Sequence, residues 1–95
     1  MNSNSININN IEEISNIILG LNNKNEIRQF LSELLTDAEI STLSKRWQIL
    51  KMLSEHSTQR EISKELNVSL CKVTRGAKIL KDKNAIVTRL FNKEN

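Results

Sequence analysis

The chain has 95 residues and a net charge of +3, which predicts a single small domain with a thin hydrophobic core. It contains 2 glycines, no proline and 3% aromatic residues, and no segment alternates as a strand does, so an all-α protein is predicted. The single cysteine excludes an intramolecular disulfide and a cysteine-rich zinc site. No signal-peptide pattern or membrane-spanning run is present, so we expect a cytoplasmic protein with no membrane partner.

Two helices are predicted in the first third of the chain, after a flexible arm. Residues 1–9 are rich in Asn and Ser and are expected to form this arm. Apolar residues recur on one side of segments 10–21 and 25–34, as they do in amphipathic helices. The apolar stripe is wider than a surface helix of a small monomer needs, so we interpret it as a dimer surface. The alternative is that both helices fold back on their own domain.

Capping boxes predict where the next two helices begin. In a capping box, a Thr side chain and a Glu three residues later each accept a hydrogen bond from the other's backbone N–H. Thr36 and Glu39 form the first box, ahead of a long helix that runs to about Glu55. Thr58 and Glu61 form the second box, which opens a short fourth helix.

The segment from about Thr58 to Lys81 has the spacing of a helix-turn-helix. Asn67 stands where the turn needs a left-handed residue, and Ser69 offers a hydroxyl that caps the second helix. Three residues after the last apolar position the pattern requires another apolar side chain, but the chain supplies Gly76. This glycine predicts either a gap or a seat for a small ligand. The apolar positions of the motif are Ile62, Leu66, Val68 and Val73.

Positive charge is concentrated on this motif. Residues 57–83 contain seven Lys and Arg against three acidic residues, a local charge of +4, whereas residues 1–26 carry −2. This concentration of cations indicates binding to the phosphate backbone of a nucleic acid. The alternative interpretation is an ordinary solvated helix face.

A sixth helix is predicted to begin at Asp82 or Asn84, so residues 10–95 are expected to form one helical DNA-binding domain with the motif at about 58–81.

No catalytic residue is predicted, and an enzyme is not expected. His56 is the only histidine and has no metal-ligating or nucleophilic partner at a suitable spacing. The chain also lacks a glycine-rich phosphate loop and a nucleophile motif, so no metal and no catalytic site are expected.

Five segments of the chain together resemble the tryptophan repressor family, over about residues 34–81. The resemblance implies a six-helix fold that forms an intertwined homodimer. It also implies a sequence-specific repressor that binds operator DNA, takes L-tryptophan as corepressor, and controls genes of tryptophan biosynthesis or uptake. The segments that carry it are Leu34-Leu35-Thr36-Asp37-Ala38-Glu39, Leu43-Ser44-Lys45-Arg46-Trp47-Gln48-Ile49, Thr58-Gln59-Arg60-Glu61-Ile62 and Val73-Thr74-Arg75-Gly76, with Leu80-Lys81.

The resemblance also implies how L-tryptophan is held. Arg46 and Arg75 match the two arginines that sandwich the indole, and guanidinium planes stack well on an aromatic face. Thr36 and Arg75 would hold the carboxylate, while the backbone carbonyls near Glu33 and Leu35 would accept hydrogen bonds from the ammonium group.

Two further positions bear on this ligand. Gly76 matches the glycine that lets the indole approach the helix. Ile79 stands where the family usually has serine, and it would either tighten the indole contact or block the ligand. The turn at Glu55-His56-Ser57 is one residue shorter than in the best-known members. These departures leave open a repressor-like DNA-binding regulator that does not sense tryptophan.

For DNA, the resemblance assigns roles along the motif. Gln59 and Arg60 would approach phosphates or the groove edge, and Leu70, Cys71 and Thr74 match the base-facing positions. With few bidentate base readers on this helix, DNA shape and water would carry much of the specificity.

Phosphate contacts are expected of three more residues of the motif. Lys72 and Lys81 supply charge, and Ser69 marks a helix start whose backbone amides can meet a phosphate.

A further alternative, from another class, is a helical protein-interaction module in which the motif docks a protein partner. Steep salt dependence of DNA binding would distinguish a DNA-binding protein from this module.

Overall fold

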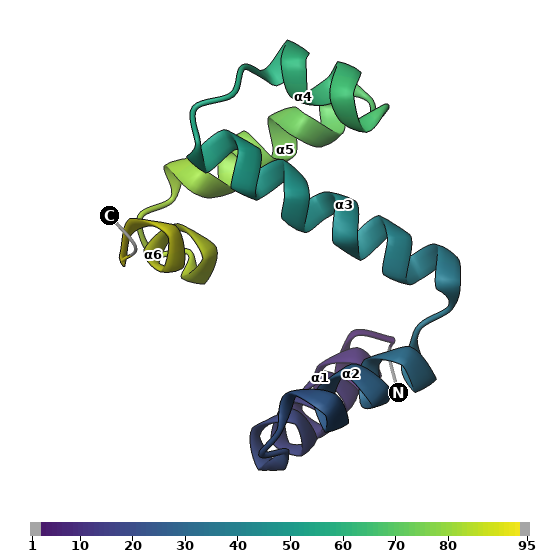
Figure 1. Cartoon of the computed structure of the whole chain (residues 1–95). Coiled ribbons are helices and arrows are strands. Elements are labelled where there is room, and N and C mark those ends of the chain that lie inside the picture. Colours follow the sequence, from purple (N-terminus) through teal and green to yellow (C-terminus); the bar gives the residue numbers. More distant parts are fainter. Residues whose placement is uncertain (1–2, 94–95) are drawn as a thin grey trace. The chain divides into compact units, whose positions relative to one another are not determined.

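In a computed structural model, residues 3–93 are described, and within them the chain forms six helices and no strand (Figure 1). The all-helical prediction and the number of helices are therefore confirmed. The chain divides into two compact units, Met1–Asp37 and Ala38–Asn95, and each is described by itself below.

The first unit holds α1 (Ser3–Gly20) and α2 (Lys24–Leu34). α1 begins at Ser3, earlier than the predicted start at residue 10, and residues 1–2 lie outside the described part. That residues 1–9 act as a flexible arm stays a prediction. Once the apolar stripe after residue 10 forms helix, the unfavourable nucleation step is complete, and the helix can extend toward the N-terminus by one hydrogen bond per added residue. No glycine or proline interrupts α1 before its end at Gly20. Asn23 caps the N-terminus of α2, because its side chain accepts a hydrogen bond from the Glu26 backbone N–H at 2.9 Å.

The long helix α3 (Asp37–Ser54) begins directly after Thr36, as the first capping box predicts. It ends in a turn in which the His56 N–H bonds the Leu53 carbonyl and the Ser57 N–H bonds the Met52 carbonyl, both at 3.0 Å. This is the hydrogen-bond pattern of a Schellman motif, and His56 adopts the left-handed conformation it requires, with φ of 70°. The shortened turn thus forms without glycine.

The helix-turn-helix consists of α4 (Gln59–Leu66) and α5 (Leu70–Lys81), close to the predicted bounds. Its two helices and α3 enclose the core of the second unit. Ile62 and Val73 are fully buried, Ile49 and Met52 from α3 pack on them, and the remaining apolar positions of the motif are half-buried at the edge of this cluster. The apolar positions predicted for the motif therefore pack into this core as expected.

The last helix, α6 (Ile86–Lys93), packs on α5. It starts later than predicted because Asp82 caps α5 instead: its backbone N–H bonds the Ile79 carbonyl, and its side chain accepts the Asn84 N–H at 2.9 Å. The buried Thr88 hydroxyl donates to the Ile79 carbonyl at 3.1 Å, and so ties α6 to the end of α5.

Candidate ligand cavity and DNA-contacting motif

Local sequence signals determine the geometry of the motif. The Glu61 N–H donates to Thr58 Oγ1 and the Thr58 N–H donates to Glu61 Oε1, both at 3.1 Å, which confirms the second capping box. Hydrogen bonding by Thr58, by its side chain first and its backbone second, lowers the pKa of Glu61 below its ordinary value of 4.5. Asn67 is left-handed, with φ of 53°, and Ser69 caps α5 by accepting the Lys72 N–H. The turn predictions are confirmed.

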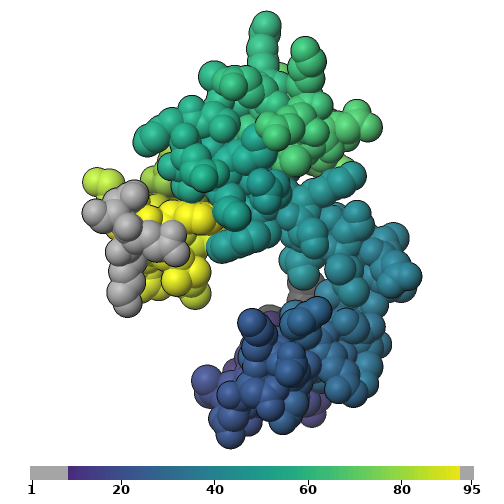
Figure 2. All heavy atoms as spheres, viewed as in Figure 1, coloured from purple at the N-terminus to yellow at the C-terminus, as the bar shows by residue number. Residues whose placement is uncertain are grey.

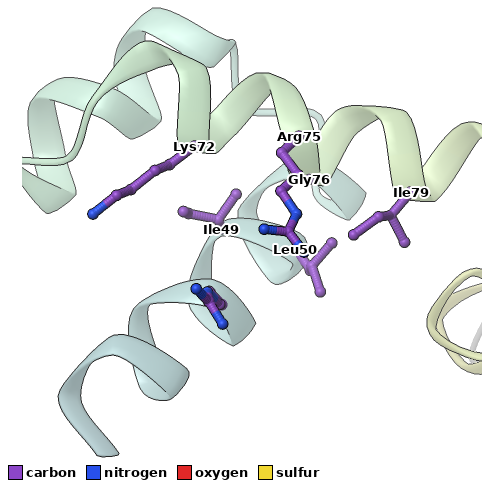
Figure 3. Close-up of a pocket in the computed structure, with 7 residues that line it drawn as sticks. Ile49, Leu50, Lys72, Arg75, Gly76 and Ile79 are labelled. Atoms are coloured by element: carbon purple, nitrogen blue, oxygen red, sulfur yellow. The ribbon is translucent and has the colours of Figure 1, made fainter. Parts of the chain in front are cut away.

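A cavity of about 280 Å³ lies between α3 and α5 (Figure 3). Its walls combine three cationic side chains with an apolar surface, and no acidic side chain contributes. The structure thus brings together four of the residues predicted to bind the ligand, although their role in binding stays a prediction. The lining residues are Arg46, Ile49, Leu50, Lys72, Arg75, Gly76 and Ile79.

Gly76 has a second function that the sequence reasoning did not identify. It is buried, and a Cβ atom at this position would lie 3.0 Å from Ile49 Cγ2 and 3.3 Å from Leu53 Cδ1. Of the two alternatives for Gly76, an empty gap at the Cβ position is excluded, because side chains of α3 fill that space, and a seat for a ligand stays a prediction. The glycine lets α5 approach α3 closely, and it also lines the cavity.

Three residues that line the cavity were not among the predicted site residues for the ligand: Ile49, Leu50 and Lys72. Their spacing could have identified them, because Ile49 and Leu50 follow Arg46 by three and four residues and share its helix face. Lys72 precedes Arg75 by one turn, and was assigned to DNA from its charge alone. Glu33, Leu35 and Thr36, the other predicted ligand contacts, belong to the unit Met1–Asp37, and their roles stay predictions.

A smaller cavity of about 120 Å³ lies beside the turn of the motif. Arg46, Ile49 and Lys72 line both cavities, so the two share part of their walls. Lys45 adds a further cation to the smaller one, and no acidic side chain lines it. The region where α3 meets the motif is therefore electropositive.

The residues predicted to contact DNA are all exposed. Figure 2 shows the green atoms of the motif at the surface of its unit. Leu70 is 47% exposed and Cys71 is exposed, as the first two residues of α5. The Thr74 hydroxyl contacts two protein acceptors, Gln59 Oε1 at 3.0 Å and the Leu70 carbonyl at 2.9 Å. The other exposed residues of this set are Gln59, Arg60, Ser69, Lys72 and Lys81.

Within residues 3–93, no group of His, Cys, Asp and Glu side chains is arranged to hold a metal ion. None of the helices that the structure describes is long and apolar enough to cross a membrane.

A helix-turn-helix with exposed cations, packed beside a cationic cavity, is typical of a DNA-binding transcription regulator. The family model described as Trp repressor protein matches residues 9–95. The chain therefore belongs to the Trp repressor family, as its motifs predict.

Among curated proteins, the chain is 32% identical over 74 residues to a Trp operon repressor homolog of Xylella fastidiosa (strain 9a5c), over 77% of this chain and 80% of the relative. Homologs from strains M23 and Temecula1 / ATCC 700964 match to the same extent. No solved structure matches the chain.

Proposed function

We propose that the protein is a transcriptional repressor that binds operator DNA as a homodimer when L-tryptophan occupies the cavity between α3 and α5. Its targets would be genes of tryptophan biosynthesis or uptake, on DNA in the cytoplasm. One observation carries the proposal: Arg46, Arg75 and Gly76, which match the family's ligand contacts, line the same cavity. The curated relatives are named Trp operon repressor homologs, in agreement with it.

The cavity suggests how a ligand would act on DNA binding. Its walls come from α3 on one side and from the recognition helix α5 on the other. An indole between the Arg46 and Arg75 guanidinium groups would contact both helices and favour one position of α5. A ligand that binds this position better than others shifts the population toward it. Thr36 and the carbonyls of Glu33 and Leu35 remain our proposed partners for its carboxylate and ammonium.

The proposed dimer is supported by apolar side chains that each unit leaves exposed. In the first unit, Ile11 is 62% and Leu19 is 84% exposed. In the second, Trp47 stacks on Phe91 at 5.2 Å between ring centroids and is still 44% exposed. Exposed apolar surface on this scale is typical of association, and two copies would present two recognition helices to two half-sites.

Titration calorimetry with L-tryptophan tests the ligand. We expect saturable binding of about one ligand per protomer, with L-phenylalanine as the negative control and indole-3-propionate to test the need for the ammonium group. Arg46→Gln should weaken binding roughly tenfold through loss of stacking. Arg60→Gln is the matched control, because Arg60 lines neither cavity, and it should bind normally. Normal affinity in Arg46→Gln would place the ligand elsewhere.

A second candidate function is a regulator of the same fold that does not sense tryptophan. Ile79 favours it, because its branched side chain lines the cavity where the family usually has serine. If the protein binds a selected duplex with no response to L-tryptophan, Ile79→Ser should restore the response. A variant that stays unresponsive would remove Ile79 as the cause.

A further inference from the structure

Two exposed side chains join the helices of the motif by a hydrogen bond. The Thr74 hydroxyl, in the middle of α5, lies 3.0 Å from Oε1 of Gln59, the first residue of α4. The same hydroxyl lies 2.9 Å from the Leu70 carbonyl. Gln59 and Thr74 are fifteen residues apart, so this contact exists only when both helices are packed as in the motif.

Of the Thr74 hydroxyl and the Gln59 carboxamide, the carboxamide keeps N–H donors that are available to a partner. A Thr hydroxyl has a single hydrogen, which Thr74 shares between two acceptors of the protein, Gln59 Oε1 and the Leu70 carbonyl. The Gln59 carboxamide accepts through Oε1, and its Nε2 carries two N–H donors. Among the residues that the structure describes, none accepts a hydrogen bond from this Nε2.

We propose that Thr74 is a positioning residue that holds the Gln59 carboxamide so that its N–H groups meet an acceptor atom of the DNA. The role rests on the DNA-binding function proposed above. A long amide side chain that is already ordered loses less entropy on binding. The acceptor is a phosphate oxygen or an acceptor on a base edge, which present the same chemistry to an amide donor. Thr74 therefore acts through Gln59, and not as the base contact expected from sequence.

A double-mutant cycle on DNA binding tests this role. The probe is a duplex that the wild-type protein selects from a random-sequence library with L-tryptophan present. Thr74→Val keeps the shape of the side chain but removes the hydroxyl, and should weaken binding roughly three- to tenfold. Thr74→Ser keeps the hydroxyl and should stay within about twofold of wild type. In a Gln59→Met background, Thr74→Val should have no further effect.

Four outcomes would overturn the role. If Thr74→Val weakens binding equally in both backgrounds, Thr74 contacts DNA itself. If Thr74→Ser is as damaging as Thr74→Val, the hydroxyl is not the operative group. If the two changes are additive in unfolding experiments without DNA, the hydrogen bond does not form in solution. Failure of the wild-type protein to select any duplex would overturn the proposed DNA-binding function, and this role with it.

The same variants identify the acceptor. If Gln59→Met weakens binding to all duplexes alike, the partner is a phosphate oxygen. If the loss disappears when one base pair is changed, the partner is a base edge. Either pattern supports the proposal.

Discussion

At the scale of single residues, two residues in the left-handed conformation end helices of the second unit. His56 and Asn67 are the non-glycine residues with positive φ in the described part of the chain, and they end α3 and α4. Asn tolerates the left-handed region through its short polar side chain, whereas His does so at a greater steric cost. The backbone hydrogen bonds of the turn after α3 hold His56 in this conformation.

His56→Gly should therefore stabilise the protein. Glycine adopts the left-handed conformation freely, but it also gains entropy in the unfolded chain, so the net gain is about 0.5 kcal/mol. Urea unfolding measures it. Glu55→Gly, one residue earlier and without a positive φ, should not stabilise. An equal gain from both changes would show that the conformation of His56 is not strained.

Gly76→Val should destabilise the protein by about 1–3 kcal/mol. The new side chain would crowd the Ile49 and Leu53 side chains, whose nearest atoms lie 3.0 Å and 3.3 Å from the added Cβ, so these side chains or the helix would have to shift. Gly20→Ala is the control, because nothing lies within 4 Å of a Cβ added at Gly20. Unchanged stability of Gly76→Val in urea unfolding would argue against close packing of these helices.

At the scale of elements, the sequence predicts features that depend on neighbouring residues, such as helix caps, better than features that depend on packing between helices. Thr58, Glu61 and Ser69 act on backbone amides three residues away, so their effect is visible in sequence alone. The start of α1 was missed because helix propagation extends beyond the apolar stripe that nucleates it. The close packing at Gly76 depends on how α5 rests on α3, which residue spacing does not determine.

The capping box of α4 makes stability depend on pH. The pKa of Glu61 is lowered in the folded protein, so its contribution is fully present above about pH 4.5 and is lost as the pH falls through the folded value. Glu61→Gln should therefore be less stable than wild type at neutral pH, and the difference should shrink in acid. Thermal unfolding at several pH values measures it. Thr58→Ala should cost about 1 kcal/mol and reduce the same pH dependence, because the backbone N–H of residue 58 can still donate to the Glu61 carboxylate.

At the scale of the whole molecule, the units expose more apolar surface than a small monomer needs. We expect a homodimer in analytical ultracentrifugation. Leu19→Glu should weaken it, because Leu19 is 84% exposed on the apolar first unit. Leu70→Glu is the matched control, since this half-exposed leucine lies on the recognition helix, and it should leave the dimer intact. If Leu19→Glu does not change the oligomeric state, α1 is not the interface.

The turn between α3 and α4 has a consequence for how a ligand signal is transmitted. It contains no glycine or proline, and two backbone hydrogen bonds close it. Such a segment is a stiff joint and not a hinge, because bending it would break both bonds and move His56 out of its left-handed conformation. If a ligand occupies the proposed site, we therefore expect the long side chains between the helices to absorb the adjustment of α5. Such a ligand would change the spacing between α3 and α5 and would not rotate the motif about the turn.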